Sequence, residues 1–307
     1  MRLLRAVIYG FGKMGRNIAL NILEKGYSVI GYDIDRSIKE SIDKEELFHS
    51  KSFMFIEEEE KILQEIKPDD LIFLLVPPGK VTDEVLTVLL ERLPEGSTLI
   101  EGGNSNYKEA MEWAALFKQK GIHFLDMGTS GGINGARNGL CAMIGGDAAV
   151  YEKIEPFLKE ICCNDGLIYA GVSGSGHYLK MIHNGIEYGM MQAIAEGFEM
   201  LEKSEFDFNY SEVAKNWNSG SVIRSWLMEL LVDSFQDNNK LDNVSGKMHA
   251  SGEVKWLMEE SIKLQLPMPV TYLSLMMRNR SLEDETFSGK VVSALRYSFG
   301  GHKVSKG

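Results

Sequence analysis

The stretch RAVIYGFGKMGRNIALNILEKG, residues 5–26, predicts the fold of the N-terminal half of the chain. A short run of strand-forming residues leads into Gly10-x-Gly12-x-x-Gly15, and an amphipathic helical pattern follows. This order is typical of a dinucleotide-binding unit: Gly10 permits a tight turn, Gly12 lets the backbone approach a pyrophosphate, and Gly15 allows close packing of helix on sheet. The free N–H groups at the start of the helix would then bind the phosphates. A glycine-rich turn in an α/β protein without a cofactor is the alternative.

A carboxylate stands at the position that discriminates between NAD and NADP. Asp33 ends the next predicted strand, where it can accept hydrogen bonds from the adenosine ribose. A 2′-phosphate would meet negative charge there, so the sequence favours NAD, although the nearby Arg36 keeps NADP open. Val76-Pro77-Pro78 follows a later strand and would either line the nicotinamide side or form a plain turn. The expected cofactor-binding residues are Gly10, Phe11, Gly12, Lys13, Met14, Gly15, Asp33, Val76 and Asn104.

Short β-rich runs alternate with helical stretches up to about residue 174, and helical periodicity alone continues to about residue 295. Such alternation is typical of a parallel sheet with helices on both faces. We therefore expect an α/β protein with an N-terminal doubly wound Rossmann-type domain, residues 1–172. An all-α C-terminal domain for substrate binding and dimerisation would follow, residues 173–307. Its tail, RYSFGGHKVSKG, is too polar and glycine-rich for a packed helix, so we expect it to be disordered or held by a partner surface.

The composition limits the classes of function. The 33 basic and 44 acidic residues give a net charge of −11, which disfavours a nucleic-acid binder or a protein of anionic membranes, because both need a positive field. Cys141, Cys162 and Cys163 form neither a disulfide framework nor a zinc-binding pattern, so we expect no metal and a reducing, cytoplasmic setting. No apolar run is long enough to span a bilayer, and the N-terminus does not resemble a signal peptide.

A long helix is predicted over residues 175–203, and it carries polar side chains on one face. Unpaired polar groups are costly to bury, so chemistry explains this face better than packing does. Lys180 and Glu187 would be about 10 Å apart along the helix axis, which suits a base and an acid acting on different atoms of one small molecule. The alternative is a solvated face with one charge pair. The residues of this face, at spacings i, i+3, i+4, i+7 and i+8, are Lys180, His183, Asn184, Glu187 and Tyr188.

Three segments carry a resemblance to a known family. They are GGNS at residues 102–105, DMGTSGGINGARNG at residues 126–139 and HYLKMIHNGIEYGMMQ at residues 177–192. The second resembles the substrate-binding signature of the β-hydroxyacid dehydrogenase superfamily. Together the three resemble the decarboxylating 6-phosphogluconate dehydrogenases of the shorter, NAD-preferring bacterial type, and the resemblance covers essentially residues 1–302. It implies that 6-phosphogluconate is oxidised at its C3 hydroxyl by NAD or NADP and loses CO2 to give ribulose 5-phosphate, without a metal.

The resemblance also assigns roles to individual residues. It implies that Lys180 is the general base, neutral at the start of the reaction, and that Glu187 is the general acid. The pKa of the lysine would have to fall from about 10.4 to about 7–8, and that of the glutamate would have to rise. Arg296 and His302 resemble the family tail that completes the neighbouring subunit's site, which implies a homodimer or a higher oligomer. The substrate carboxylate and hydroxyls would be held by Asn104, Ser130, Gly131, Gly132, His183 and Asn184, and the phosphate region by Tyr188, Lys255 and Arg280.

The sequence departs from the family at two points and leaves two alternatives. Glu253-Val254 stands before Lys255 where the family usually has small residues, and the chain lacks the extra helical repeat of the longer enzymes. The nearest alternative is a 3-hydroxyacid dehydrogenase that does not decarboxylate, but a substrate without phosphate would have no use for Glu187 and the two C-terminal arginines. The other alternative is a non-catalytic dinucleotide-binding protein on the same fold, which the intact Lys180 disfavours.

Overall fold

The computed structural model describes residues 4–283 and 285–302. The chain forms two compact units, Met1–Lys180 and Met181–Gly307. The division falls inside one long helix, whereas the boundary expected from the sequence lies in front of that helix, and the boundary at 172/173 stays a prediction. None of the helices in the described ranges combines the length and the hydropathy that a bilayer crossing requires.

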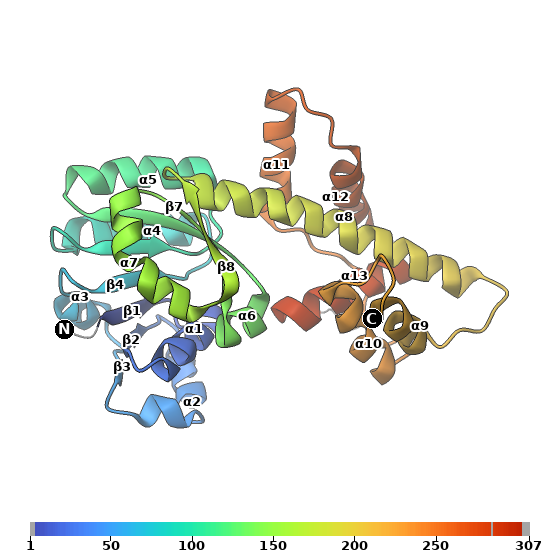
Figure 1. Ribbon diagram of the computed structural model, residues 1–307, viewed down its shortest axis with the longest axis horizontal. Helices are drawn as coiled ribbons and strands as arrows, with labels where there is room; N and C mark the ends of the chain where they lie inside the picture. The colour runs from blue at the N-terminus through green and yellow to red at the C-terminus, as the bar shows by residue number, and fades with distance from the viewer. Residues whose placement is uncertain (1–3, 284, 303–307) are drawn as a thin grey trace. The chain divides into compact units, whose positions relative to one another are not determined.

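The first unit is built on an eight-stranded sheet with the order β3-β2-β1-β4-β5-β6-β7-β8 (Figure 1). Neighbouring strands pair in parallel, except for β6 and β7, which are antiparallel. This topology confirms the predicted α/β fold with a Rossmann-type sheet. The strands are β1 Arg5–Tyr9, β2 Ser28–Tyr32, β3 Phe53–Phe55, β4 Leu71–Leu74, β5 Thr98–Glu101, β6 His123–Ser130, β7 Leu140–Gly145 and β8 Cys162–Gly171.

Side chains of the central strands alternate between two cores, as a sheet covered on both faces requires. Ala6 and Ile8 of β1 pack in a core shared with α1, α6 and α7. Val7 and Tyr9 of the same strand pack in a second core, shared with α3, α4 and α5. The helices are α1 Lys13–Glu24, α2 Lys39–Ile42, α3 Glu59–Glu65, α4 Lys80–Arg92, α5 Tyr107–Gln119, α6 Gly132–Asn138 and α7 Ala148–Ile161, with 3₁₀ turns at Arg36–Ile38 and Glu46–His49.

Two strands at one edge of the sheet were not predicted. β7 pairs with β6 after the short helix α6, and β8 runs through DGLIYAG, just before the expected domain boundary at 172/173. β8 is an edge strand with mostly exposed or half-buried side chains, so its sequence lacks the continuous apolar run that marks the central strands. A register shift between Leu140 and Ala142 also interrupts its pairing with β7.

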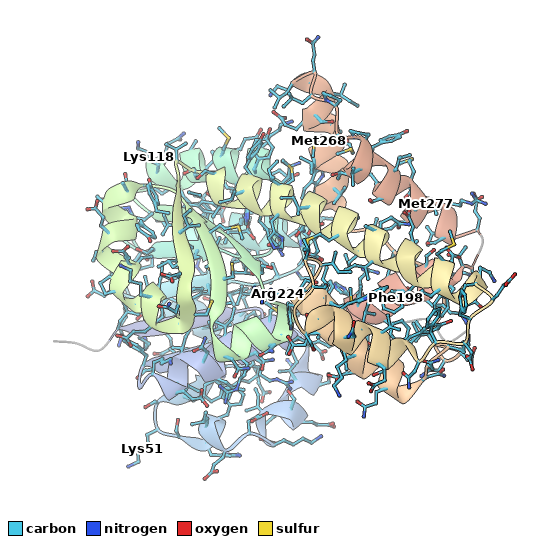
Figure 2. The ribbon with its side chains drawn as sticks, turned by 45° about the vertical axis from the view of Figure 1, so that its right-hand side comes forward. Lys51, Lys118, Phe198, Arg224, Met268 and Met277 are labelled. Carbon is cyan, nitrogen blue, oxygen red and sulfur yellow. The ribbon has the colours of Figure 1, made fainter. Side chains whose placement is uncertain are left out.

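Within the described residues, the second unit contains helices and no strands. The helix α8 runs over Ser175–Lys203, which confirms the predicted long helix, and it continues from the first unit into the second. Phe198 of α8, labelled in Figure 2, is buried among the rings of Tyr210, Trp217 and Phe235, with ring centroids 6.1, 5.5 and 4.8 Å away. The remaining helices are α9 Tyr210–Asn218, α10 Trp226–Asp237, α11 Gly252–Lys263, α12 Pro269–Ser281 and α13 Phe287–Gly300.

Helix α13 corrects the expectation for the C-terminal tail. Residues 296–300, expected not to form a packed helix, are the last residues of α13. Thr286 caps this helix by accepting a hydrogen bond from a backbone N–H of its first turn at 3.1 Å, and Leu295 is buried. The cap and the apolar face outweigh the polar composition of the last turn, and Gly301, with φ 58°, ends the helix. The expectation for residues 303–307 falls outside the described residues.

Candidate active site

The glycine loop between β1 and α1 has the geometry of a phosphate-binding turn. Gly10 has φ +101°, and a Cβ there would lie 2.6 Å from the Leu75 carbonyl oxygen. A Cβ on Gly15 would lie 2.0 Å from the Gly10 carbonyl oxygen, so the start of the helix packs directly on the turn. Gly12 caps α1 without a side-chain hydrogen bond, and a Cβ there would meet no described heavy atom within 4 Å. The open space beside Gly12, at the start of α1, fits a pyrophosphate.

Asp33 is fixed against this loop by two backbone hydrogen bonds. Its Oδ2 accepts from the Phe11 N–H at 2.7 Å, and its Oδ1 accepts from the Asp35 N–H at 2.9 Å. Phe11 is buried and packs on Gly31, where a Cβ would lie 2.6 Å from the Phe11 ring. Each carboxylate oxygen can accept a further hydrogen bond, so Asp33 keeps acceptor capacity for ribose hydroxyls. The structure thus brings Asp33 together with the loop at residues 10–15.

The loops after β4 and β5 lie against each other. A Cβ on Gly103 would come within 2.6 Å of the Val76 carbonyl oxygen and 2.8 Å of Glu101 Oε1. Asn104 follows with φ 59°, a left-handed conformation that asparagine adopts more readily than most residues. In the part of the chain that the structure describes, Asn104 Oδ1 and Ser105 Oγ are buried without a hydrogen-bond partner. A bound polar ligand or an ordered water would satisfy them, which supports the expected role of Asn104.

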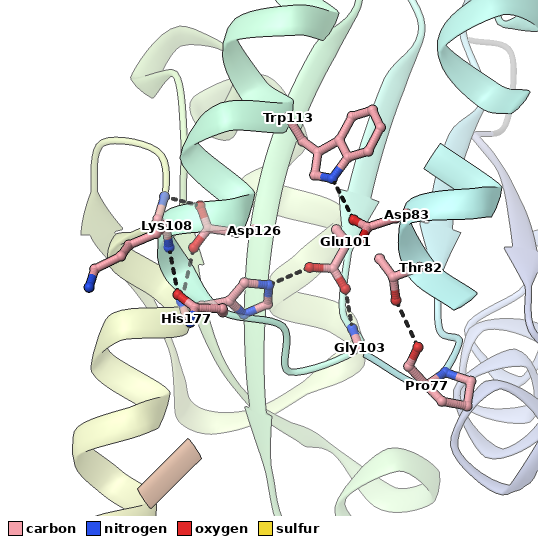
Figure 3. Close-up of polar contacts among 11 residues, drawn as sticks. Pro77, Thr82, Asp83, Glu101, Gly103, Lys108, Trp113, Asp126 and His177 are labelled. Carbon is pink, nitrogen blue, oxygen red and sulfur yellow. Dashed lines mark hydrogen bonds and ion pairs between the residues drawn. The ribbon is translucent and has the colours of Figure 1, made fainter. Parts of the chain in front are cut away.

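A buried polar network that the sequence analysis missed connects this loop with helix α8 (Figure 3). Glu101 Oε1 accepts a hydrogen bond from the Gly103 N–H at 2.6 Å, and its Oε2 lies 2.6 Å from His177 Nε2. Both side chains of this pair are 1% exposed. Burial opposes the charge of His177, but the Glu101 carboxylate outweighs it and raises the pKa of the imidazole. The sequence feature that could have indicated this network is Glu101, an acidic residue at the end of the apolar run STLIE.

Asp126 on β6 belongs to the same network and caps the start of α8 (Figure 3). Its fully buried carboxylate accepts hydrogen bonds from the Gly174 N–H at 2.6 Å and the His177 N–H at 2.9 Å. A negative charge there satisfies free N–H groups and complements the helix dipole. Two residues further along β6, a Cβ on Gly128 would lie 2.4 Å from Lys180 Cβ. Strand β6 and the first turns of α8 therefore hold Lys180, which is 6% exposed.

The expected substrate residues Ser130, Gly131 and Gly132 stand at the end of the same strand. Ser130 is the last residue of β6, and the two glycines lead into α6 with φ 97° and 56°. These left-handed conformations favour glycine, and all three residues are half-buried. Strand β6 thus carries both the cap of the Lys180 helix and the loop that the resemblance assigns to the substrate.

In the second unit, α8 continues with four of the predicted polar residues. His183 Nδ1 lies 3.7 Å from Glu187 Oε2 and 3.3 Å from Asn184 Oδ1. Tyr188 is buried, and its hydroxyl accepts a hydrogen bond from the Ser251 N–H at 3.1 Å. The Glu187 side chain is 22% exposed, so it remains accessible to a bound molecule. The helical spacing therefore predicted the approach of His183 to Glu187.

Arg278 of α12 contacts this face, whereas the sequence analysis chose Arg280. The Arg278 guanidinium carbon lies 3.3 Å from the centroid of the Tyr188 ring, and the residue is 3% exposed. Burial, and to a lesser extent the charge of Arg296, lower the pKa of Arg278 to about 10. Arg280 is exposed, because two positions along a helix turn a side chain by about 200°. The spacing of the polar residues on the buried face of α12 could have identified Arg278 in the sequence. These residues are Thr271, Ser274 and Arg278.

Arg296 on α13 lies near the same residues of its own chain. Burial lowers its pKa, while Tyr188, Glu187 and Glu253 oppose this shift by favouring its charged form. In the described part of the chain, neither Arg296 nor Arg278 has a carboxylate oxygen within 4.0 Å. The sequence analysis expected Arg296 to complete a neighbouring subunit's site, and that role stays a prediction.

Two other predicted residues lie elsewhere on these helices. Lys255 is exposed on α11, and the residue of α11 that approaches the arginines is Glu253. Glu253 Oε2 is buried without a hydrogen-bond partner among the described residues. The ring of His302 folds back over Gly300, where a Cβ would lie 2.6 Å from it. The substrate roles of Lys255, His302 and Arg280 stay predictions.

Family models match both parts of this arrangement. The model for the NAD-binding domain of 6-phosphogluconate dehydrogenase matches residues 6–176, and the model for the C-terminal domain of 6-phosphogluconate dehydrogenase matches residues 176–290. The chain belongs to the 6-phosphogluconate dehydrogenase family. It is therefore an NAD(P)-dependent oxidoreductase whose N-terminal domain binds the nicotinamide cofactor.

Several 6-phosphogluconate dehydrogenases are similar over nearly the whole chain. YqeC of Bacillus subtilis (strain 168), whose assignment to this enzyme is provisional, is 48% identical over 97% of this chain and 98% of its own. The NAD-dependent, decarboxylating enzyme of Haloferax volcanii is 34% identical over 97% of this chain and 98% of its own. The structure of the Plasmodium falciparum enzyme matches 91% of this chain and 62% of its own, with a TM-score of 0.80 and 29% identity. A Mycobacterium tuberculosis 3-hydroxyisobutyrate dehydrogenase shares the fold, with a TM-score of 0.70 and 20% identity, and the match covers 96% of this chain and 99% of that enzyme.

Proposed function

We propose that this member of the family converts 6-phosphogluconate to ribulose 5-phosphate and CO2, with NAD as the preferred hydride acceptor. The observation that carries the proposal is the pair of arginines near Tyr188: Arg278 is buried against its ring, and Arg296 is half-buried. A buried guanidinium without a carboxylate partner is costly, and a phosphate dianion would compensate both charges through charge-assisted hydrogen bonds. A 3-hydroxy acid without phosphate would leave both guanidinium groups without a charge-assisted hydrogen-bond partner. The decarboxylating relative from Haloferax volcanii supports the same chemistry.

Lys180 would act as the base in the oxidation step. The bound cofactor supplies the acceptor for the hydride of C3, and the amine of Lys180 takes the proton of the C3 hydroxyl. The amine must be neutral to do so, and Lys180 is held in a buried position. When CO2 leaves the β-keto acid, the electron pair of the broken bond moves toward the C3 oxygen, and Lys180 returns its proton there.

Glu187 would complete the reaction by protonating the carbon that becomes C1 of the product. It lies two helical turns beyond Lys180 on α8, at about 10 Å along the axis, so it acts on a different part of the substrate. His183, 3.7 Å from the Glu187 carboxylate, would orient this carboxyl group and bind substrate hydroxyls. Asn184, which is buried beside His183, would contribute a further hydrogen bond.

The NAD preference rests on Asp33. Its carboxylate is held at the glycine loop by the Phe11 and Asp35 N–H groups, so it cannot easily move away from a 2′-phosphate. Arg36 is exposed in the turn that follows and is the group that would favour NADP. A fixed carboxylate opposes a phosphate more strongly than an exposed, solvent-screened arginine attracts it, which supports NAD as the preferred cofactor.

We further propose that the enzyme is a homodimer that acts in the cytoplasm. Ile186 of α8 and Leu273 of α12 are both 60% exposed, and a second copy would cover such apolar side chains. The three cysteines are free thiols, which is consistent with a reducing compartment.

One assay tests the reaction. Purified protein is given 6-phosphogluconate with NAD or NADP, and reduced cofactor and released CO2 are followed together. We expect equal amounts of both products, with faster turnover for NAD. Reduced cofactor without CO2 would identify a 3-hydroxyacid dehydrogenase, and absence of both products would overturn the proposed reaction.

A further inference from the structure

The ion pair between Glu101 and His177 has no part in the chemistry described above. Its atoms are 2.6 Å apart and its side chains 1% exposed, so water screens the pair very little. Removing two charges from water costs about as much as their attraction returns, so a buried pair is a weak device for stability alone. A role that an apolar pair could not fulfil therefore explains it better.

The two ends of the pair belong to two elements that carry proposed substrate residues. Glu101 ends β5, and its second oxygen fixes the Gly103 N–H at 2.6 Å, directly before Asn104. Asn104 is held in a left-handed conformation, with φ 59°. His177 precedes Lys180 by three positions on α8, which places both on the same side of that helix. The ion pair is thus a direct side-chain link between the Asn104 loop and the lysine helix (Figure 3).

We propose that Glu101 and His177 are positioning residues that fix the distance between the Asn104 amide and the Lys180 amine. This inference rests on the proposed function, since it assumes that these groups bind and deprotonate one substrate. Asp126 completes the arrangement by holding the backbone of His177. The imidazole can then fix the position of α8 relative to β5. A hydrogen bond between neutral groups would hold the same contact more weakly, because charged partners roughly double its strength.

The unsatisfied atoms near the link support this reading. His177 Nδ1, Asn104 Oδ1 and Ser105 Oγ are buried and lack hydrogen-bond partners among the described residues. Buried polar atoms are nearly always paired, so these three leave hydrogen-bonding capacity for a polar ligand or an ordered water. A link that served folding alone would not need unpaired hydrogen-bonding atoms beside it.

Three variants separate charge from shape. Glu101→Gln keeps an oxygen that can accept from the Gly103 N–H but removes the charge. His177→Gln keeps a donor toward Glu101, whereas His177→Phe keeps a ring and removes the donor. The exposed His123, on β6 in the same unit, gives the matched control His123→Gln.

The first measurement is steady-state kinetics with 6-phosphogluconate. Misplacement of a reacting group by about 1 Å can cost about 100-fold in rate, so we expect kcat/KM to fall by about that factor in His177→Phe and less in His177→Gln. The dissociation constant of NAD should stay near wild type in His177→Gln and Glu101→Gln, and so should the melting temperature of Glu101→Gln, in which a neutral His177 leaves no unpaired buried charge. Equal losses in NAD affinity, melting temperature and kcat/KM would indicate a purely structural pair and overturn the proposal, as would wild-type kinetics in His177→Phe.

The second measurement needs no turnover. Amide exchange at Gly103 should be about tenfold faster in His177→Phe, although the acceptor Glu101 is intact, because the loop has lost its anchor on α8. Unchanged exchange would overturn the link even if the enzyme is active. If the wild type fails to turn over 6-phosphogluconate, the proposed function fails, while accelerated exchange would still establish the coupling between loop and helix.

Discussion

The guanidinium of Arg278 stacks on the ring of Tyr188, with 3.3 Å between the guanidinium carbon and the ring centroid. The Tyr188 hydroxyl is held in turn by the Ser251 N–H at 3.1 Å, so the platform under the arginine is fixed. A stacked guanidinium keeps its N–H edge available for a planar or tetrahedral anion. In the proposed function, helices α8 and α12 thereby form a preorganised anion-binding group from residues distant in sequence.

The variant Arg278→Met should raise the KM for 6-phosphogluconate. Losing a charge-assisted hydrogen bond costs about 1.5–3 kcal/mol, so the expected change is about 10- to 100-fold. Thermal stability should not fall, because an apolar side chain replaces a buried charge. Arg280→Met, two positions away on the exposed side of α12, is the matched control. A larger rise of the KM in Arg280→Met than in Arg278→Met would instead support the prediction that Arg280 binds the substrate phosphate.

The close contact between Gly128 and Lys180 predicts a second effect. Gly128→Ala would place a Cβ 2.4 Å from Lys180 Cβ, so strand and helix must move apart. Overpacking of this kind costs about 1–3 kcal/mol, and the melting temperature and kcat should both fall. Gly197→Ala on α8 is the control, since a Cβ there meets no described heavy atom within 4 Å. Wild-type turnover in Gly128→Ala would show that Lys180 tolerates displacement.

The variant Glu187→Gln should separate the two halves of the reaction. General acid catalysis contributes about 100- to 10,000-fold, so steady-state kcat should fall by at least 100-fold. Hydride transfer in the first turnover should keep its wild-type rate, because Lys180 and not Glu187 acts in that step. Stopped-flow measurement of reduced cofactor tests this directly. A slow first turnover would assign Glu187 to substrate binding or oxidation instead.

The variant Asp33→Asn should shift the cofactor preference toward NADP. It removes the charge but keeps an oxygen that can accept from the Phe11 N–H, so the loop should stay intact. A single charge near a phosphate contributes on the order of 1–2 kcal/mol, and the ratio of kcat/KM for NADP over NAD should rise about tenfold. Arg36→Ala should lower the same ratio. An unchanged ratio in Asp33→Asn would show that the carboxylate does not face the ribose.

Mixed dimers test which chain supplies Arg296. Since Arg296 lies beside Glu187 and Tyr188 of its own chain, chains carrying Glu187→Gln and chains carrying Arg296→Ala should not restore activity when mixed. Each site would then hold one lesion. Subunit exchange is verified with two affinity tags before the assay. Recovery of activity above both parents would mean that Arg296 acts across the interface, as the resemblance of the tail implied.

The central part of the fold was predictable because its signals are local. The strand at Arg5–Tyr9, the glycine loop and the helix at Ser175–Lys203 follow from patterns of two, three or four residues. The polar face of α8 was predictable for the same reason, since helical spacing alone brings His183 close to Glu187. Edge strand β8 was missed because its side chains are half-exposed and carry no continuous apolar run. The last turn of α13 was missed because its stability comes from burial upstream.

The sequence by itself determined the α/β architecture, the site of the cofactor and the order of the polar groups on α8. Only the tertiary structure decided that Arg278 rather than Arg280 lies buried on Tyr188, and that Glu101 and His177 form one ion pair. The physical reason is distance along the chain. Periodicity reports which side chains share a face of one element, whereas contacts between elements depend on strand pairing and packing over many residues, which no local pattern encodes.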